Sequence, residues 1–247
     1  MKIIDYFDRI YVINLPVCTD RLKSIRRELI RAGMPFKPGK VELFSAIKPD
    51  DPAGFIHASW RGCFLSHLNV LKLAKKEKLS NVLVMEDDLL IYRKFFRNQD
   101  LIVEYLNKYK WGFVYFAHSV KFHQNSYPKL IELSQDVCWT TFYGVNSTIF
   151  DRLIYFLEEY VEKIKANPPS INLGLDSVYS LFRRENKDII TLIATPALGT
   201  QGNFPHEVFR GSKKITLFYY LNLIKRLPVV KQLLYPLSLL IRWLTDT

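Results

Sequence analysis

The chain has 247 residues, of which 49% are hydrophobic and 14% aromatic, so it is long enough and apolar enough to bury a substantial core and is not a disordered chain. Lys and Arg (35) outnumber Asp and Glu (24), and the net charge of +11 favours anionic partners such as phosphorylated ligands, a membrane surface or nucleic acid. Cys18, Cys63 and Cys138 lack paired spacing, which predicts neither a disulfide framework nor a zinc site.

Strands and helices are predicted to alternate along the chain. Short apolar runs predict buried strands at residues 10–15, 41–45, 81–85, 111–116, 140–148 and 189–195. Amphipathic patterns predict helices at residues 20–32, 60–79, 92–109, 150–164 and 174–183. Gly33 suits the end of the first helix. This alternation predicts an α/β domain with a mostly parallel central sheet flanked by helices, in which ligands bind beyond the carboxyl ends of the strands.

The composition changes near residue 209, which predicts a catalytic domain over residues 1–208 and a basic, aromatic-rich helical tail over residues 209–247. The tail interleaves Lys and Arg with Leu, Tyr and Trp, as is typical of segments that attach to an anionic membrane surface. Alternatively, the tail packs on the domain or forms a homo-oligomer interface. No nucleic-acid module accompanies the charge, so nucleic-acid binding is not expected.

The N-terminus lacks the apolar stretch of a signal peptide, and no run of 18 apolar residues predicts a spanning helix. We therefore expect a cytoplasmic protein, attached peripherally to the inner face of the cytoplasmic membrane through its tail.

Three adjacent carboxylates, Glu86, Asp87 and Asp88, follow the third predicted strand. They repel one another unless a cation compensates them. In an extended segment Glu86 and Asp88 point to one side and Asp87 to the other, toward the protein or a ribose. Two hard oxygen donors suit Mg²⁺ or Mn²⁺, which bind substrate phosphates. The sequence thus predicts a metal pair, Glu86 and Asp88, with a solvated acidic turn as the alternative.

Polar residues also surround the end of the first predicted strand. Asn14 and Leu15 end the strand, and Asp20 and Arg21 open the next helix. The Arg21 side chain suits a phosphate, and the N-terminus of the same helix also favours anions. Alternatively, Asp20 is only a helix-start residue and Arg21 a surface charge.

Ser66 and His67 are adjacent in the second predicted helix. They are no catalytic dyad, because neighbours in sequence do not face each other on a helix. Either one of them faces a nucleotide, or Gly62 marks a tightly packed helix start and His67 is a core histidine.

Three segments stand in a characteristic order: YVINLPVCTDRLKSI (residues 11–25), WRGCFLSHL (60–68) and VLVMEDDLLI (82–91). Together they resemble glycosyltransferase family 25, which includes lipooligosaccharide galactosyltransferases and the collagen galactosyltransferase domain. Weaker matches follow at residues 143–154, 173–181 and 195–201. The chain departs from the family pattern at Trp60-Arg61, where a glycine is usual, and at residues 16–18, where the family has an Arg-rich turn.

The resemblance implies a GT-A-like nucleotide-binding fold and an inverting, metal-dependent transfer of a hexose, galactose favoured. The donor would be a UDP-sugar, the metal Mn²⁺ or Mg²⁺, and the acceptor a saccharide, free or lipid-linked, of a bacterial surface glycan such as lipooligosaccharide. The implied metal ligands are Glu86 and Asp88. The implied nucleotide contacts are Asn14, Leu15, Asp20, Arg21, Ser66, His67 and Asp87.

An inverting transfer also needs a base near the acceptor hydroxyl. Asp176 is the candidate because it opens a helix downstream of the sheet, although it could serve only as that helix's cap. His206 and Glu207 are lower-ranked candidates. The alternative to an enzyme is a non-catalytic family member that acts as a binding or assembly subunit in polysaccharide biosynthesis.

Overall fold

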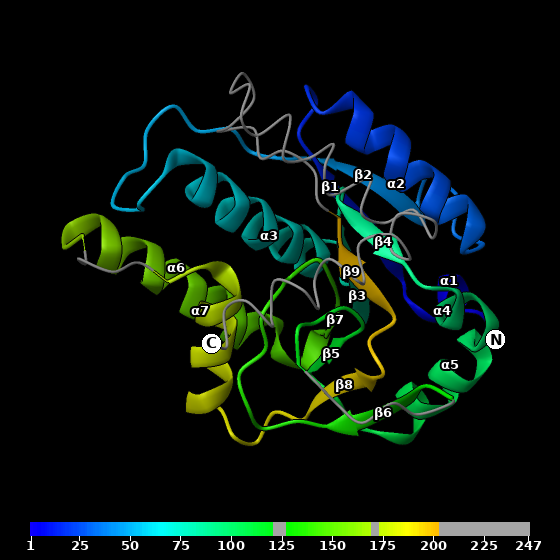
Figure 1. Ribbon diagram of the computed structural model, residues 1–247. Helices are drawn as coiled ribbons and strands as arrows, with labels where there is room; N and C mark the ends of the chain where they lie inside the picture. The colour runs from blue at the N-terminus through cyan, green and yellow to red at the C-terminus, as the bar shows by residue number, and fades with distance from the viewer. Residues whose placement is uncertain (121–126, 169–172, 203–247) are drawn as a thin grey trace, which may run out of the picture. The chain divides into compact units, whose positions relative to one another are not determined.

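The computed structural model describes residues 1–120, 127–168 and 173–202, which form a central sheet between two groups of helices (Figure 1). The large sheet contains β1 (Arg9–Asn14), β2 (Val41–Ser45), β3 (Asn81–Glu86), β5 (Phe113–Tyr115), β6 (Lys129–Glu132), β7 (Phe142–Asn146) and β8 (Thr191–Thr195). A small sheet pairs β4 (Leu89–Ile91) with β9 (Gly199–Gln201). The helices are α1 (Ile3–Tyr6), α2 (Thr19–Arg31), α3 (Ala58–Lys76), α4 (Arg93–Arg97), α5 (Gln99–Lys108), η1 (Ser147–Ile149), α6 (Phe150–Ala166) and α7 (Leu175–Glu185).

The strand order of the large sheet is β2-β1-β3-β7-β5-β8-β6. β2, β1, β3, β5 and β8 run in one direction, whereas β7 and β6 run against their neighbours. The predicted α/β fold with a mostly parallel sheet is therefore confirmed. The reversed β7 lies between two parallel groups, so the segment that enters β7 reaches the same edge of the sheet at which β1 and β3 end.

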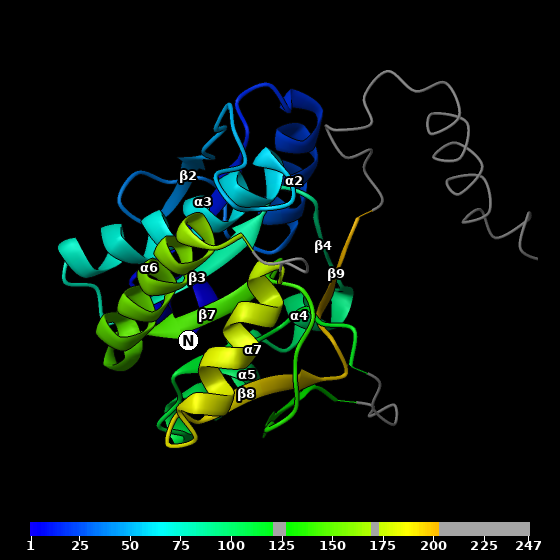
Figure 2. The ribbon, with the colours of Figure 1, turned by 90° about the vertical axis from the view of Figure 1, so that its left-hand side faces the viewer.

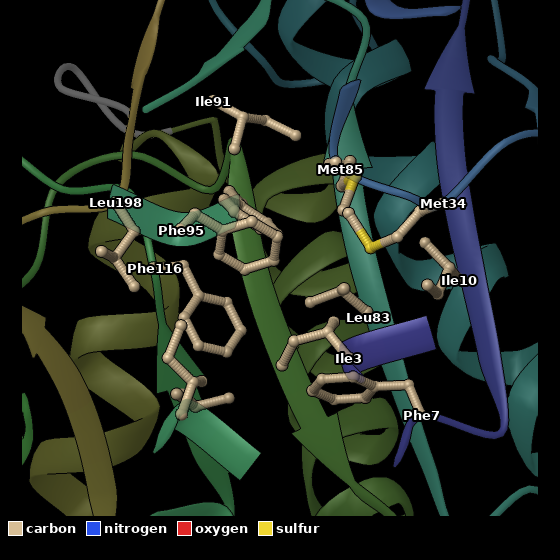
Figure 3. Packing of buried hydrophobic residues seen from close by; sticks show 14 of the residues in the cluster. Ile3, Phe7, Ile10, Met34, Leu83, Met85, Ile91, Phe95, Phe116 and Leu198 are labelled. Atoms are coloured by element: carbon tan, nitrogen blue, oxygen red, sulfur yellow. The ribbon is translucent and has the colours of Figure 1, made fainter. Parts of the chain in front are cut away.

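Two hydrophobic cores lie on opposite faces of the sheet, as the alternation of side chains along a strand requires. In β3, Val82 and Val84 pack with α3, α6 and α7, while Leu83 and Met85 pack with α1, α2, α4 and α5. Figure 2 shows the first group of helices over the near face of the sheet. Figure 3 shows the second core, where Phe95 and other apolar side chains lie close to Leu83 and Met85.

Most predicted elements are present, with differences at short or divided ones. The helix predicted over residues 92–109 is divided at Asn98, whose backbone (φ −127°, ψ 23°) is not helical. Sequence periodicity missed α1, β4, β6 and β9, because three or four residues carry too little pattern. Gly33 ends α2 at φ +71°, as predicted.

The predicted tail at residues 209–247, together with His206 and Glu207, lies outside the described residues. Within the described ranges, no helix combines the length and the apolar character needed to cross a bilayer.

Candidate functional site

The candidate site lies where neighbouring strands end. Asn14 and Glu86 are the last residues of β1 and β3, which pair in parallel. Thr140 and Thr141 lead into the reversed β7, and the carbonyl of Thr141 accepts a hydrogen bond from the Glu86 amide at 3.0 Å. The sheet order therefore brings polar groups from three strands to one edge of the sheet, the edge at which open α/β folds bind their ligands.

Asp87 is buried and held by the two polar residues predicted at the end of β1 and the start of α2. Asn14 Nδ2 donates to Asp87 Oδ2 at 2.7 Å, and Arg21 Nη1 lies 3.3 Å from Asp87 Oδ1. Burial raises the pKa of Asp87 to about 6 even though Arg21 and Asn14 act to lower it. Asp87 thus points toward the protein, and it fixes the guanidinium of Arg21 at the site.

Asp88 is buried too, but it is less well partnered. Its Oδ2 accepts a hydrogen bond from Gln201 Nε2 at 3.0 Å and lies 3.9 Å from Arg21 Nη1. Its Oδ1 is buried and has no hydrogen-bond partner within residues 1–120, 127–168 and 173–202. Burial, followed by the charge of Glu86, raises the pKa of Asp88 to about 7. Arg21 therefore faces the buried carboxyl groups of both Asp87 and Asp88.

The prediction that residues 86–88 are extended is wrong, because Asp87 and Asp88 form the turn between β3 and β4. Side chains alternate between two sides only along an extended strand, so strand geometry does not place Glu86 and Asp88 on the same side. Glu86 and Asp88 nevertheless interact, as the effect of Glu86 on the pKa of Asp88 indicates.

Glu86 points toward α3 and the segment before β7. Thr140 Oγ1 donates to Glu86 Oε1 at 3.0 Å, and His67 Nε2 lies 3.5 Å from the same oxygen. Burial acts to raise the pKa of Glu86, but His67, Thr140 and Arg21 together outweigh it, and the pKa is lowered. Glu86 is therefore favoured as an anion.

Ser66 and His67 occupy different environments. Ser66 Oγ donates to the Gly62 carbonyl at 2.6 Å and accepts from the Ile47 amide at 2.8 Å, so Ser66 ties α3 to the preceding loop. A Cβ at Gly62 would collide with the Ile47 carbonyl, which explains the glycine at this packed helix start. His67 is completely buried, with Nδ1 2.8 Å from the Tyr143 hydroxyl and Nε2 facing Glu86.

A cavity of about 190 Å³ adjoins Glu86 and contains the predicted base, Asp176. Asp176 Oδ2 accepts a hydrogen bond from the Trp139 amide at 3.2 Å. Trp139 has a left-handed backbone (φ 79°), a conformation that costs free energy in a bulky residue and that often occurs at ligand sites. Its neighbours in the cavity wall are Phe55, Trp60, Cys63, Phe64, Thr140, Thr141, Leu173, Gly174, Leu175 and Gln201.

The other two predicted residues lie beside this cluster. Leu15 is half-buried just after β1, and its carbonyl accepts from the Cys18 amide at 2.8 Å. Asp20 is exposed in the first turn of α2, near enough to contribute to the raised pKa of Asp87.

Sequence reasoning assigned no role to Thr140, Trp139, Cys63 or Gln201. Nothing in the local sequence identifies Thr140 or Trp139, because strand order alone brings them to Glu86. Cys63 and Gln201 belong to the segments at residues 60–68 and 195–201, which could have indicated them.

Residues 55–166 match the model of glycosyltransferase family 25 (LPS biosynthesis protein). No curated protein matches the chain. Solved structures similar to it include a glycosyltransferase involved in the glycosylation of the major capsid of PBCV-1, with 10% identity, a TM-score of 0.48 and coverage of 85% of this chain and 98% of that one. Two others are A197 from STIV (13% identity, TM-score 0.39, coverage 76% and 81%) and mannose-1-phosphate geranyltransferase from Thermus thermophilus (11%, 0.37, 76% and 73%). All three TM-scores lie below 0.5, so these likenesses carry no argument about function.

Proposed function

We propose that this glycosyltransferase, whose residues 55–166 match the model of family 25, transfers a hexose, galactose favoured, from a UDP-sugar to a saccharide. The acceptor proposed is a bacterial surface glycan such as lipooligosaccharide, and the transfer inverts the anomeric carbon. The observation that carries the donor part of this proposal is the pair of buried carboxyl groups at the end of β3, opposite a single arginine.

The residues present fit a divalent cation. Asp88 Oδ1 is buried and unpartnered among the described residues. The pKa of Asp88 is raised because its burial and the charges of Glu86 and Asp87 outweigh the effects of Gln201 and Arg21. Asp88 and Glu86 would hold the ion, and oxygen ligands of this kind suit Mn²⁺ or Mg²⁺. When bound, such an ion neutralises charge on the leaving diphosphate.

The nucleotide is proposed to lie along the end of β1 and the start of α2. Arg21 would bind phosphate, and the N-terminus of the 13-residue helix α2 adds a favourable dipole. Asn14, Leu15, Asp20 and Asp87 would surround it, with Asp87, itself held by Asn14, keeping Arg21 in place. Ser66 and His67 would act from behind this site, since neither is exposed.

The acceptor is proposed to enter the cavity lined by Trp60 and Trp139, because aromatic faces suit the apolar faces of sugar rings. Asp176, in the same cavity, would take the proton from the attacking hydroxyl. Its Oδ2 is oriented by the Trp139 amide and its Oδ1 by the Ser177 amide. The tail, residues 209–247, is proposed to hold the enzyme at the anionic inner leaflet, where a lipid-linked acceptor would be found.

The donor site is tested by measuring UDP release from a panel of UDP-sugars with Mn²⁺ and an oligosaccharide acceptor. Asp88→Asn should lower the rate by more than about tenfold, since even residues that only support metal ligands contribute about 10- to 100-fold. Asp151→Asn is the matched control, because Asp151 is an exposed acid on α6. Full activity of Asp88→Asn, or no UDP release by the wild type with any donor, would contradict the proposal.

A further inference from the structure

Cys63, His67 and Glu86 form a mixed cluster behind the acidic turn. Cys63 and His67 lie four residues apart on α3, so they share one face of the helix, and Glu86 meets them from the end of β3. One ligand atom from each residue, a sulfur, a nitrogen and an oxygen, lies within 4.8 Å of the other two. The donor site proposed above uses the oxygen of this set and leaves the sulfur and nitrogen unexplained.

His67 is arranged as metal-binding histidines usually are. Its Nδ1 is 2.8 Å from the Tyr143 hydroxyl, which in turn is 3.1 Å from the Tyr179 hydroxyl, and the His67 and Tyr143 rings stack. A second hydrogen bond of this kind orients the ring and leaves the other nitrogen to face a metal. His67 Nε2 is indeed buried, and it has no hydrogen-bond partner among the residues that the structure describes.

The spacing of the cluster also suits a small tetrahedral ion. His67 Nε2 and Glu86 Oε1 are 3.5 Å apart, which is long for a hydrogen bond. Two ligands bound at about 2.0–2.1 Å in a tetrahedron lie about 3.3 Å apart. The Cys63 sulfur lies within 4.8 Å of a ring nitrogen of His67 and a carboxylate oxygen of Glu86, and Cys63 lines the adjoining cavity of about 190 Å³.

We propose that Cys63, His67 and Glu86 form a second cation site, selective for Zn²⁺ and similar thiophilic ions, whose fourth position opens into the cavity. Mg²⁺ and Mn²⁺ prefer oxygen ligands, whereas thiolate and imidazole select Zn²⁺ and Co²⁺, so this site takes a different ion from the carboxylates at Asp88. On binding, the Cys63 thiol releases its proton to solvent and its sulfur bonds to the ion. The oxidation states of sulfur and metal do not change.

Co²⁺ added to the metal-free full-length chain tests this site without any glycosyl transfer. A cobalt–thiolate bond gives a near-ultraviolet charge-transfer band that carboxylate ligands do not give. The wild type should show this band, and stoichiometric Zn²⁺ should abolish it. Cys63→Ser should lack the band, while Cys138→Ser, the control at another exposed cysteine, should keep it.

Absence of the band from the wild type, or its persistence in a folded Cys63→Ser protein, would overturn the proposal. Tyr143→Phe provides a second measurement, because it keeps all three ligands and removes only the hydroxyl that orients His67. The band should remain while the affinity for Co²⁺ falls about 10- to 100-fold. Unchanged affinity would contradict the role proposed for the Tyr143 hydroxyl in orienting His67 toward the ion. Near-ultraviolet circular dichroism of each variant reports whether it is folded.

Discussion

Replacement of Asn14 by alanine tests how firmly the acidic turn is held against the sheet. Asn14 is 2% exposed, and its Nδ2 donates both to Asp87 Oδ2 (2.7 Å) and to the Cys18 carbonyl (3.2 Å). A hydrogen bond to a charged group contributes about 1.5–3 kcal/mol, and a bond between neutral groups about 1 kcal/mol. Asn14→Ala should therefore lower the free energy of unfolding by about 3 kcal/mol.

Urea denaturation followed by fluorescence measures this difference as a shift of the midpoint at constant slope. In a thermal melt the same loss should lower Tm by about 6–12 °C, because about 2–4 °C corresponds to 1 kcal/mol in a domain of this size. Asn107→Ala is the control, since Asn107 is exposed on α5 and its change should stay within about 0.5 kcal/mol. A loss below about 1 kcal/mol for Asn14→Ala would refute the view that Asn14 anchors Asp87.

Two further predictions concern the charge of the site and the tail. The pKa values of Asp87 and Asp88 are raised to about 6 and about 7, so the folded metal-free protein keeps these two protons to a higher pH than the unfolded chain does. The stability that this proton binding contributes is present at low pH and is lost as pH rises through 6–7. Mn²⁺ should offset this loss. The rise in Tm that Mn²⁺ causes should therefore be larger at pH 7.5 than at pH 5.5, where protons compete with the ion. An equal rise at both pH values would mean that the ion binds elsewhere. Deletion of residues 209–247 should reduce co-sedimentation of the protein with anionic liposomes. Unchanged co-sedimentation would exclude the tail as the attachment segment. A truncated chain that is insoluble would favour packing of the tail on the domain.

Long periodic segments made the fold predictable from the sequence. The apolar run of β3 and the amphipathic pattern of α3 each carry enough residues to specify an element and its place in an α/β fold. The sequence also predicts Asn14 and the acidic triplet at one edge of the sheet, because Asn14 and Glu86 stand at the ends of strands that run in parallel.

The detailed geometry of the site could not be read in this way. The turn at Asp87 and Asp88 depends on the pairing of β4 with β9, two short strands more than a hundred residues apart. The contacts of Glu86 with His67 and Thr140 depend on the position of the reversed β7 in the sheet. Spacing along the chain carries no information about either arrangement.

The direction of β7 has a consequence for how relatives of this protein can diversify. Glu86 is the last residue of a strand that ends at the site, whereas Trp139 and Thr140 precede a strand that begins there. Insertions or deletions before β7 can therefore reshape the cavity without moving β1, β3 or the residues that follow them. We expect the shape of the cavity to vary among relatives through the length and sequence of residues 133–139, while the residues at the ends of β1 and β3 keep their places.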